Sequence, residues 1–148
     1  MAKFIFKMQN ILNLKYKLEE QAKIEFSLAA GRLAEEEKKL AELKNRRFYY
    51  ELKLKEAMKD VLDIRNIKSL EEAVEVMKFR IKVQTVAVND AKLHLEKARR
   101  NLNRAMSDRK TYEKLRENAF EEFKKEINDQ EKKEIDELVS YKYGAGTA

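Results

Sequence analysis

Residues 70–123 read LEEAVEVMKFRIKVQTVAVNDAKLHLEKARRNLNRAMSDRKTYEKLRENAFEEF. Positions spaced alternately four and three residues apart form a series along this stretch, and all but Gln84, Arg109 and Arg116 are apolar. The series is Leu70, Val74, Met77, Ile81, Gln84, Val88, Ala91, Leu95, Ala98, Leu102, Ala105, Arg109, Tyr112, Arg116, Ala119 and Phe123. A 3.5-residue repeat keeps an apolar seam on one side of a helix that winds around another helix. The stretch therefore predicts a coiled coil.

A second seam with the same spacing occupies the first half of the chain. It runs Ala22, Phe26, Ala29, Leu33, Glu36, Leu40, Leu43, Arg47, Tyr50, Leu54, Ala57, Val61 and Ile64. Upstream we expect it to continue through Phe4, Met8, Ile11, Lys15 and Leu18. The two four-residue steps from Leu18 to Ala22 to Phe26 predict a local relaxation of the left-handed supercoil. The small residues around Gly31 indicate a close approach of the partner backbone.

The composition favours helix at nearly every position. Of the 148 residues, 41% are charged, three are Gly, and Pro and Cys do not occur. Such a chain has few of the residues that form turns and strands, which predicts a single all-α domain over residues 1–148. Without Cys it forms no disulfide or thiolate metal site, which is compatible with the cytoplasm. No apolar run is long enough for a signal peptide or a membrane span.

The two seams set the expected helix boundaries. Helix one should span about residues 3–65, the turn about 65–69 and helix two about 69–140, with a frayed tail over 141–148. Ser69 followed by Glu72 matches a capping box at the start of a helix. The alternative is one continuous helix through residue 66.

Charge distribution decides how the two seams pair. Residues 92–116 are basic and residues 117–140 are acidic. A chain that folds back at about residue 67 sets the basic segment against the acidic residues 19–43, whereas a parallel dimer would align like charges. In this register Arg109 falls near Glu25, and Gln84 falls near the Tyr50 hydroxyl. The sequence therefore predicts an all-α fold, a long two-helix antiparallel coiled-coil hairpin.

The sequence shows no motif typical of catalysis. The single histidine, His94, is expected on the helix surface, since one His without Cys makes no zinc site. No phosphate-binding loop or nucleophile–base pair is present, so we expect no enzyme, no cofactor and no metal site. The basic residues 92–116 could bind nucleic acid, but the acidic segment that faces them accounts for their charge.

An aromatic cluster, Phe48, Tyr49 and Tyr50, is a candidate for protein binding. Tyr50 belongs to the seam, and three successive residues cannot all face one partner helix. Two interpretations remain open. The cluster is an exposed docking patch for another protein, or the seam widens locally and buries two of the three rings.

The two ends of the chain resemble the flagellar export protein FliJ family. The opening carries a Phe-x-Phe pattern followed by a charged helix, with Phe4, Phe6, Met8, Gln9, Ile11, Leu12, Glu19 and Glu20. The closing element is Glu134, Ile135, Asp136, Glu137 and Leu138. The length, the two-helix layout and the lack of Cys agree with this family over nearly the whole chain.

The resemblance implies a non-enzymatic, stalk-like component of the flagellar type III protein export apparatus. Such a protein binds and promotes the hexameric flagellar export ATPase, contacts the cytoplasmic domain of the export gate and escorts export chaperones. It is cytoplasmic and peripheral at the inner-membrane export apparatus. The alternatives are the equivalent stalk protein of a virulence type III secretion system, a rotary-ATPase central stalk and, from another class, a nucleic-acid-binding coiled coil.

The resemblance also implies two groups of partner-binding residues. The group expected to contact the export gate is Phe48, Tyr49, Tyr50, Met77 and Gln84. The group expected at the ATPase ring comes from both ends of the chain and is Lys3, Lys7, Lys15, Lys124, Lys125 and Lys132. In the expected register residue 4 faces about residue 130, so the two termini lie at the same end of the hairpin.

Overall fold

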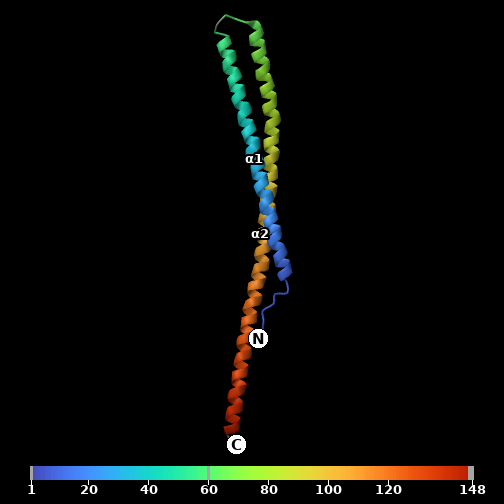
Figure 1. Cartoon of the computed structure of the whole chain (residues 1–148), viewed down its shortest axis with the longest axis vertical. Coiled ribbons are helices and arrows are strands. Elements are labelled where there is room, and N and C mark those ends of the chain that lie inside the picture. The colour runs from blue at the N-terminus through green and yellow to red at the C-terminus, as the bar shows by residue number, and fades with distance from the viewer. Residues whose placement is uncertain (1, 60, 147–148) are drawn as a thin grey trace. The chain divides into compact units, whose positions relative to one another are not determined.

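The computed structural model of the chain describes residues 2–59 and 61–146. It contains two long helices, α1 (Gln9–Ala57) and α2 (Ile64–Gly146), and the described residues include no strand. The two helices pack against each other as a helical hairpin (Figure 1). The predicted fold class is therefore confirmed.

The hairpin divides into two compact units, each with a part of both helices. Unit 1 combines Met1–Glu20 with Arg104–Ala148, and unit 2 is Gln21–Asn103. Each unit is described below by itself. The single domain expected from the composition stays a prediction.

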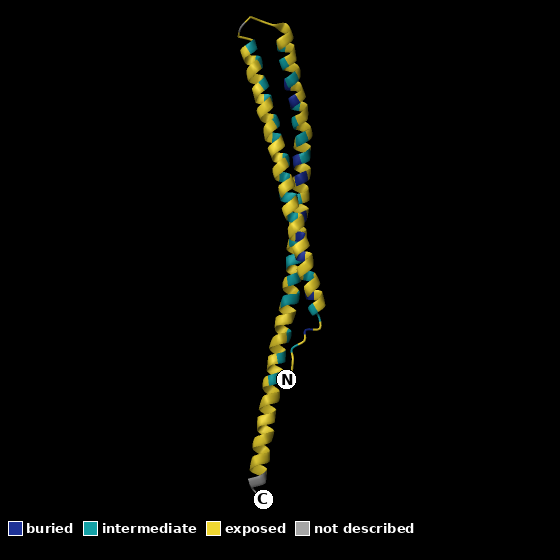
Figure 2. Cartoon of the chain, in the orientation of Figure 1, coloured by how far each residue is buried: buried dark blue, intermediate teal, exposed yellow. Residues whose placement is uncertain are grey.

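Unit 2 is built around the predicted seam. On α2 the residues Val74, Met77, Val88, Ala91 and Ala98 are buried. The α1 series from Phe26 to Ala57 is half-buried at every one of its seam positions. In Figure 2 the buried and half-buried positions of this unit lie mainly on the sides of the two helices that face each other. The seam ends at Ala57, because Val61 and Ile64 are exposed.

The turn lies earlier than predicted. α1 ends at Ala57 and α2 begins at Ile64, so the expected turn at residues 65–69 is wrong. Asp63 caps α2, since its Oδ1 accepts hydrogen bonds from the backbone N–H groups of Arg65 (3.1 Å) and Asn66 (3.4 Å). Such a side-chain acceptor satisfies N–H groups that the first helical turn leaves without a partner. Ser69, the predicted cap, lies inside α2.

The outer helix boundaries also differ from those predicted. α1 begins at Gln9 rather than near residue 3, because residues 2–6 are not helical and a turn follows at Lys7 and Met8. α2 continues to Gly146 through most of the tail that was expected to fray. Residues 147–148 of that tail lie outside the described residues.

The N-terminal segment of unit 1 packs on α2. The ring of Phe4 lies 5.1 Å from that of Phe120 and 5.4 Å from that of Phe123, as measured between centroids. Phe6 and Leu12 are buried. The expected position of residue 4 opposite residue 130 is therefore wrong.

Two positions of the predicted α1 seam in unit 1, Ile11 and Leu18, are wrong. Leu12 and Glu19 are the buried side chains, whereas Ile11 and Leu18 are exposed. Met8, Leu12, Lys15, Glu19 and Ala22 continue the alternating spacing of four and three. The relaxation of the supercoil pattern predicted at Leu18 is therefore absent, because a glutamate occupies the seam position.

The pairing of the helices in unit 2 differs from the predicted register. Gln84 Nε2 donates a 2.9 Å hydrogen bond to the backbone carbonyl of Glu36, and not to the Tyr50 hydroxyl. Arg32 pairs with Asp90 at 2.9 Å. Both contacts set α2 against residues several turns earlier in α1, because the chain reverses before residue 64 and not at residue 67.

This register predicts a short distance between labels at Ala34 and Asn89. The two exposed residues neighbour the Arg32–Asp90 ion pair, and the chain has no Cys of its own. Pulsed electron resonance on the doubly labelled monomer should give a shorter distance than for Asn45 and Asn89. Asn45 lies about 16 Å further along the helix at 1.5 Å per residue. The opposite order of the two distances would restore the register expected from the sequence.

A second prediction concerns Gly31. The expected close approach of the partner backbone is wrong, since a Cβ added at Gly31 would meet nothing within 4 Å. Gly31→Ala should therefore raise the free energy of unfolding by about 1 kcal/mol, the difference in helix propensity. Urea unfolding measures this change, and a loss of stability would show that the site has no room for a methyl group.

Candidate partner-binding surfaces

A buried ion pair lies in the seam of unit 1. Only 5% of Glu19 is exposed. Arg109 Nε lies 2.6 Å from Glu19 Oε2, and Arg109 Nη2 lies 3.1 Å from Glu19 Oε1. Two parallel hydrogen bonds of this kind combine charge with fixed geometry. The predicted partner of Arg109, Glu25, is wrong, because the seam passes through Glu19.

Further polar contacts surround this pair. Arg109 Nη1 donates to Glu113 Oε2 at 3.0 Å, and the Tyr16 hydroxyl donates to Glu113 Oε1. The hydrogen bond from Tyr16, and then that from Arg109, lower the pKa of Glu113 below its usual range. The same contact with Glu113 raises the pKa of Tyr16. This cluster binds the start of α1 to α2, which is a structural role within the hairpin.

The aromatic cluster leaves two of its three rings in solvent. Phe48 is 63% exposed and Tyr49 is 55% exposed, while Tyr50 is half-buried in the seam. The Tyr49 and Tyr50 ring centroids are 5.6 Å apart, and the Lys53 amine lies 5.6 Å from the Tyr49 ring. This geometry is that of an exposed patch on α1 and not of a widened seam.

Met77 and Gln84, the α2 residues of the predicted gate-binding group, face α1. Met77 is buried, and the Gln84 amide bonds to the Glu36 carbonyl. Both side chains are therefore engaged within the hairpin. Their contact with a partner stays a prediction.

Sequence reasoning missed a second apolar row on α2. Its large side chains lie two residues after seam positions and are between 46% and 70% exposed. We call them the outer row: Val76, Phe79, Val83, Val86 and Leu93. The signal was present in the sequence, because the outer row follows the alternating spacing of the seam itself, with one interruption at Asp90.

Two of the six lysines predicted at the ATPase ring have partners inside unit 1. Lys15 pairs with Asp108 at 3.7 Å, and its amine lies 5.6 Å from the centre of the Tyr112 ring. Lys124 pairs with Glu121 at 3.5 Å. These two lysines support the local structure as well as offering charge.

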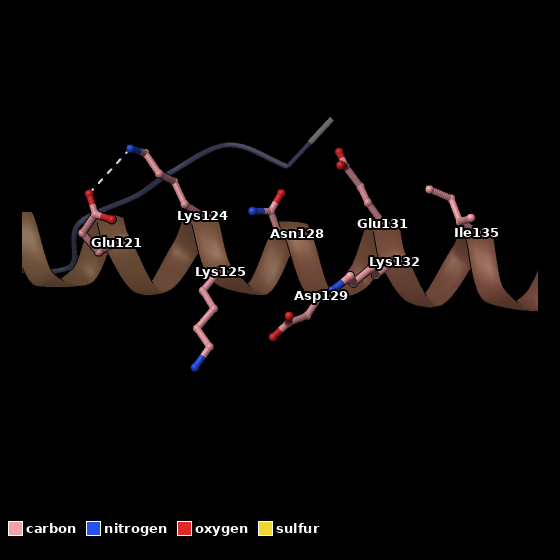
Figure 3. A pocket seen from close by; sticks show the side chains of 8 residues that line it. All are labelled: Glu121, Lys124, Lys125, Asn128, Asp129, Glu131, Lys132 and Ile135. Atoms are coloured by element: carbon pink, nitrogen blue, oxygen red, sulfur yellow. Dashed lines mark ion pairs between the residues drawn. The ribbon is translucent and has the colours of Figure 1, made fainter.

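The other four lysines of the group, Lys3, Lys7, Lys125 and Lys132, are exposed. Lys124, Lys125 and Lys132 line an open hollow of about 530 Å³ on α2. Figure 3 shows the side chains around it, which all project from this one helix. The hollow is lined by Glu121, Lys124, Lys125, Asn128, Asp129, Glu131, Lys132 and Ile135. Its lining mixes both signs of charge along a single helix, which suits contact with another protein better than enclosure of a small ligand.

His94 occupies the expected surface position. It is exposed, and its Nδ1 lies 3.0 Å from the Asp90 carbonyl oxygen. Across the described part of the chain, no cluster of three or more His, Cys, Asp or Glu residues could hold a metal ion. Neither helix, over its described residues, is long and apolar enough to cross a membrane.

Comparison with known proteins gives the family. The family model described as flagellar FliJ protein matches residues 4–147. The chain belongs to the FliJ family. The match includes both ends of the chain, which hold the motifs that resemble this family. Membership of the FliJ family makes the protein a component related to flagellar export. No curated protein and no solved structure matches the chain.

The lowered pKa of Glu113 predicts a pH-dependent contribution to stability. A carboxyl group whose pKa is lower in the folded state stabilises it above the ordinary value of 4.5. That contribution is lost as the pH falls through the lowered pKa. Glu113→Gln should therefore lower the melting temperature at pH 7 and by much less at about pH 3.

Circular dichroism melts of the two proteins at both pH values measure this difference. Glu117→Gln is the matched control, because Glu117 is exposed and its 3.6 Å ion pair is with Lys114 on its own helix. The control substitution should change the melting temperature little at either pH. If Glu113→Gln lowered the melting temperature equally at both pH values, the assignment of the Glu113 carboxylate to the cluster would be contradicted.

Proposed function

We propose that this chain is a non-enzymatic, stalk-like coiled coil of the flagellar type III export apparatus. In this role it binds and promotes the hexameric export ATPase, contacts the cytoplasmic domain of the export gate and escorts export chaperones. It acts in the cytoplasm and reaches the inner membrane through these partners. The observation that carries the proposal is the FliJ-family match over residues 4–147.

The packing of the chain supports a role in protein contacts. Among the described residues, every buried side chain except Phe6 lies at a seam position of α1 or α2. A two-helix hairpin keeps most of its side chains on its outside, where catalytic groups would stay hydrated. Contacts made by an outer helix face are shallow, which lets a shaft touch the similar subunits of a ring without locking to one of them.

The exposed aromatic patch supports contact with the export gate. Phe48 and Tyr49 present most of their ring surface to solvent. Aromatic side chains contribute large contact areas in protein interfaces, and exposed apolar patches mark interaction sites. These two residues are the members of the predicted gate-binding group that a partner can reach.

Replacing both aromatic residues tests the gate contact. Phe48→Ala with Tyr49→Ala should weaken binding to the export-gate domain at least about tenfold and leave the melting temperature nearly unchanged. Isothermal titration and thermal melts give the two readouts. Ile24→Ala with Leu28→Ala is the matched control, since both are exposed apolar residues of α1 outside the patch. Equal binding by the two variants would remove the patch from the proposal.

The lysine-rich end supports contact with the ATPase ring. Lys7 and Lys132 are exposed in unit 1 and have no role in its seam. Charges in a narrow, partly desolvated pore act more strongly than charges on an open surface. Lys7→Glu with Lys132→Glu should therefore reduce ring assembly and the stimulation of ATP hydrolysis, while binding to the export-gate domain is retained.

The control for this experiment carries the same change of charge near the turn. Lys55→Glu with Lys59→Glu alters two exposed lysines of unit 2. This variant should stimulate the ATPase as the original chain does. If the control lost stimulation and the Lys7 and Lys132 variant kept it, the turn would be the end that contacts the ring.

A further inference from the structure

The outer row of α2 has charges of opposite sign at its two ends. Extended in both directions with the same spacing, its positions are Ser69, Glu72, Val76, Phe79, Val83, Val86, Asp90, Leu93, Lys97 and Arg100. Glu71 and Glu75 flank the first end, and Arg99 flanks the last. The row is therefore acidic, then apolar, then basic, and it lies entirely within unit 2.

This row has the geometry of a coiled-coil seam without a helix on it. Alternating steps of three and four are what a helix needs to hold a stripe against a partner helix. α1 covers a different face of α2, the face of Val74, Met77 and Val88. Phe79, Val86 and Leu93 each expose two thirds or more of their surface. A second coiled-coil contact can therefore form on this side.

The charge pattern of the row is complementary to itself. When a second copy of α2 is laid antiparallel about a point between Gln84 and Thr85, Val83 meets Val86 and Val76 meets Leu93. In the same arrangement Glu72 meets Lys97. We propose that the outer row binds a second copy of this chain, as an antiparallel two-fold dimer. A two-fold interface uses the same patch on both copies, which is the property that this row has.

One position of the row is polar within its apolar part. Asp90 falls opposite Phe79 in the proposed pairing. Its carboxylate already lies 2.9 Å from Arg32 Nη2 on α1 of the same chain. The charge of Asp90 is therefore balanced before the second copy arrives, although this layer adds less apolar contact than the others.

The area of the outer row limits the affinity of the dimer. Residues 69–100 span about 45 Å at 1.5 Å per residue, and a helix with its side chains is about 10 Å wide. The contact then covers about 450 Å² on each copy, compared with about 800 Å² per partner in a standard stable interface. The dimer is therefore weak and reversible, and the outer row is covered at high concentration and open at low concentration. The proposal goes beyond the proposed function and does not depend on it.

Sedimentation equilibrium of the full chain tests the dimer. The mass should rise from 17.6 kDa towards twice that value as the concentration increases from about 10 μM to about 1 mM. Lys97→Glu with Arg100→Glu places like charges at both ends of the interface and should raise the dimer Kd at least about tenfold. Adding Glu71→Lys and Glu72→Lys to that variant should restore the original Kd.

The restored variant is the decisive arm, because only a self-complementary interface recovers when both ends of one chain are reversed. Phe79→Ser should weaken the dimer without loss of helicity, and Asp90→Leu should strengthen it. A mass of one chain over the whole concentration range overturns the proposal. The proposal is also overturned if the variant with all four charge substitutions does not recover the original Kd. If the chain stays monomeric and Phe79→Ser weakens binding to the export-gate domain, the row belongs to that partner.

Distances between copies test the direction. With one label per chain, at Thr85, the two labels in a dimer should be within about 15 Å, since packed helices lie 8–10 Å apart. With labels at Asn101 they should be about 50 Å apart, because antiparallel helices place these residues at opposite ends of the contact. Short distances at both positions would indicate a parallel dimer and overturn the arrangement.

Discussion

In each unit, polar side chains within the seam between α1 and α2 have partners on the opposite helix. Glu19 is among the most buried residues of the chain, and Arg109 engages both of its carboxylate oxygens. In unit 2 the Gln84 amide bonds to Glu36 from the same kind of position. A buried charge without a partner would be costly, so these pairs admit only arrangements that bring the partners together.

The same constraint decides which residues are left for other proteins. Two helices can bury only one stripe each, so every other apolar side chain remains on the outside. Phe48 and Tyr49 on α1 and the outer row on α2 are such residues. In a FliJ-family chain, which offers contacts rather than catalysis in the function proposed for it, these exposed groups are the natural places to look for binding.

Periodicity predicted a coiled coil and most of its seam, and the charge distribution predicted the hairpin. Periodicity failed where hydrophobicity and burial disagree. An apolar seam predicts Leu18, but Glu19 occupies the position, because Arg109, 90 residues away in the sequence, supplies the partner that it needs. Ser69 and Asp63 are both plausible helix caps, and only the observed hydrogen bonds to Asp63 separate them. Charge matching averaged over long segments changes little when one helix slides by a few residues, so it gave the antiparallel direction but not the register.

The candidate sites divide in the same way. Steric reasoning on three successive aromatic residues predicted that some would be exposed, and Phe48 and Tyr49 are. The seam predicted that Met77 and Gln84 would face α1, and both do. Their assignment to a partner came from the resemblance alone. The outer row was overlooked because the stronger seam beside it had already explained the periodicity.

The most direct test of this account compares two neighbouring residues of α1. Leu18 is 42% exposed and Glu19 is 5% exposed. Urea unfolding should therefore show a lower midpoint for Glu19→Ala than for Leu18→Ala, because the first change removes both hydrogen bonds between Glu19 and Arg109 and leaves Arg109 with Glu113 alone. Replacing both Glu19 and Arg109 by Leu should recover the midpoint or raise it. A larger loss for Leu18→Ala would place the leucine in the seam and contradict the account.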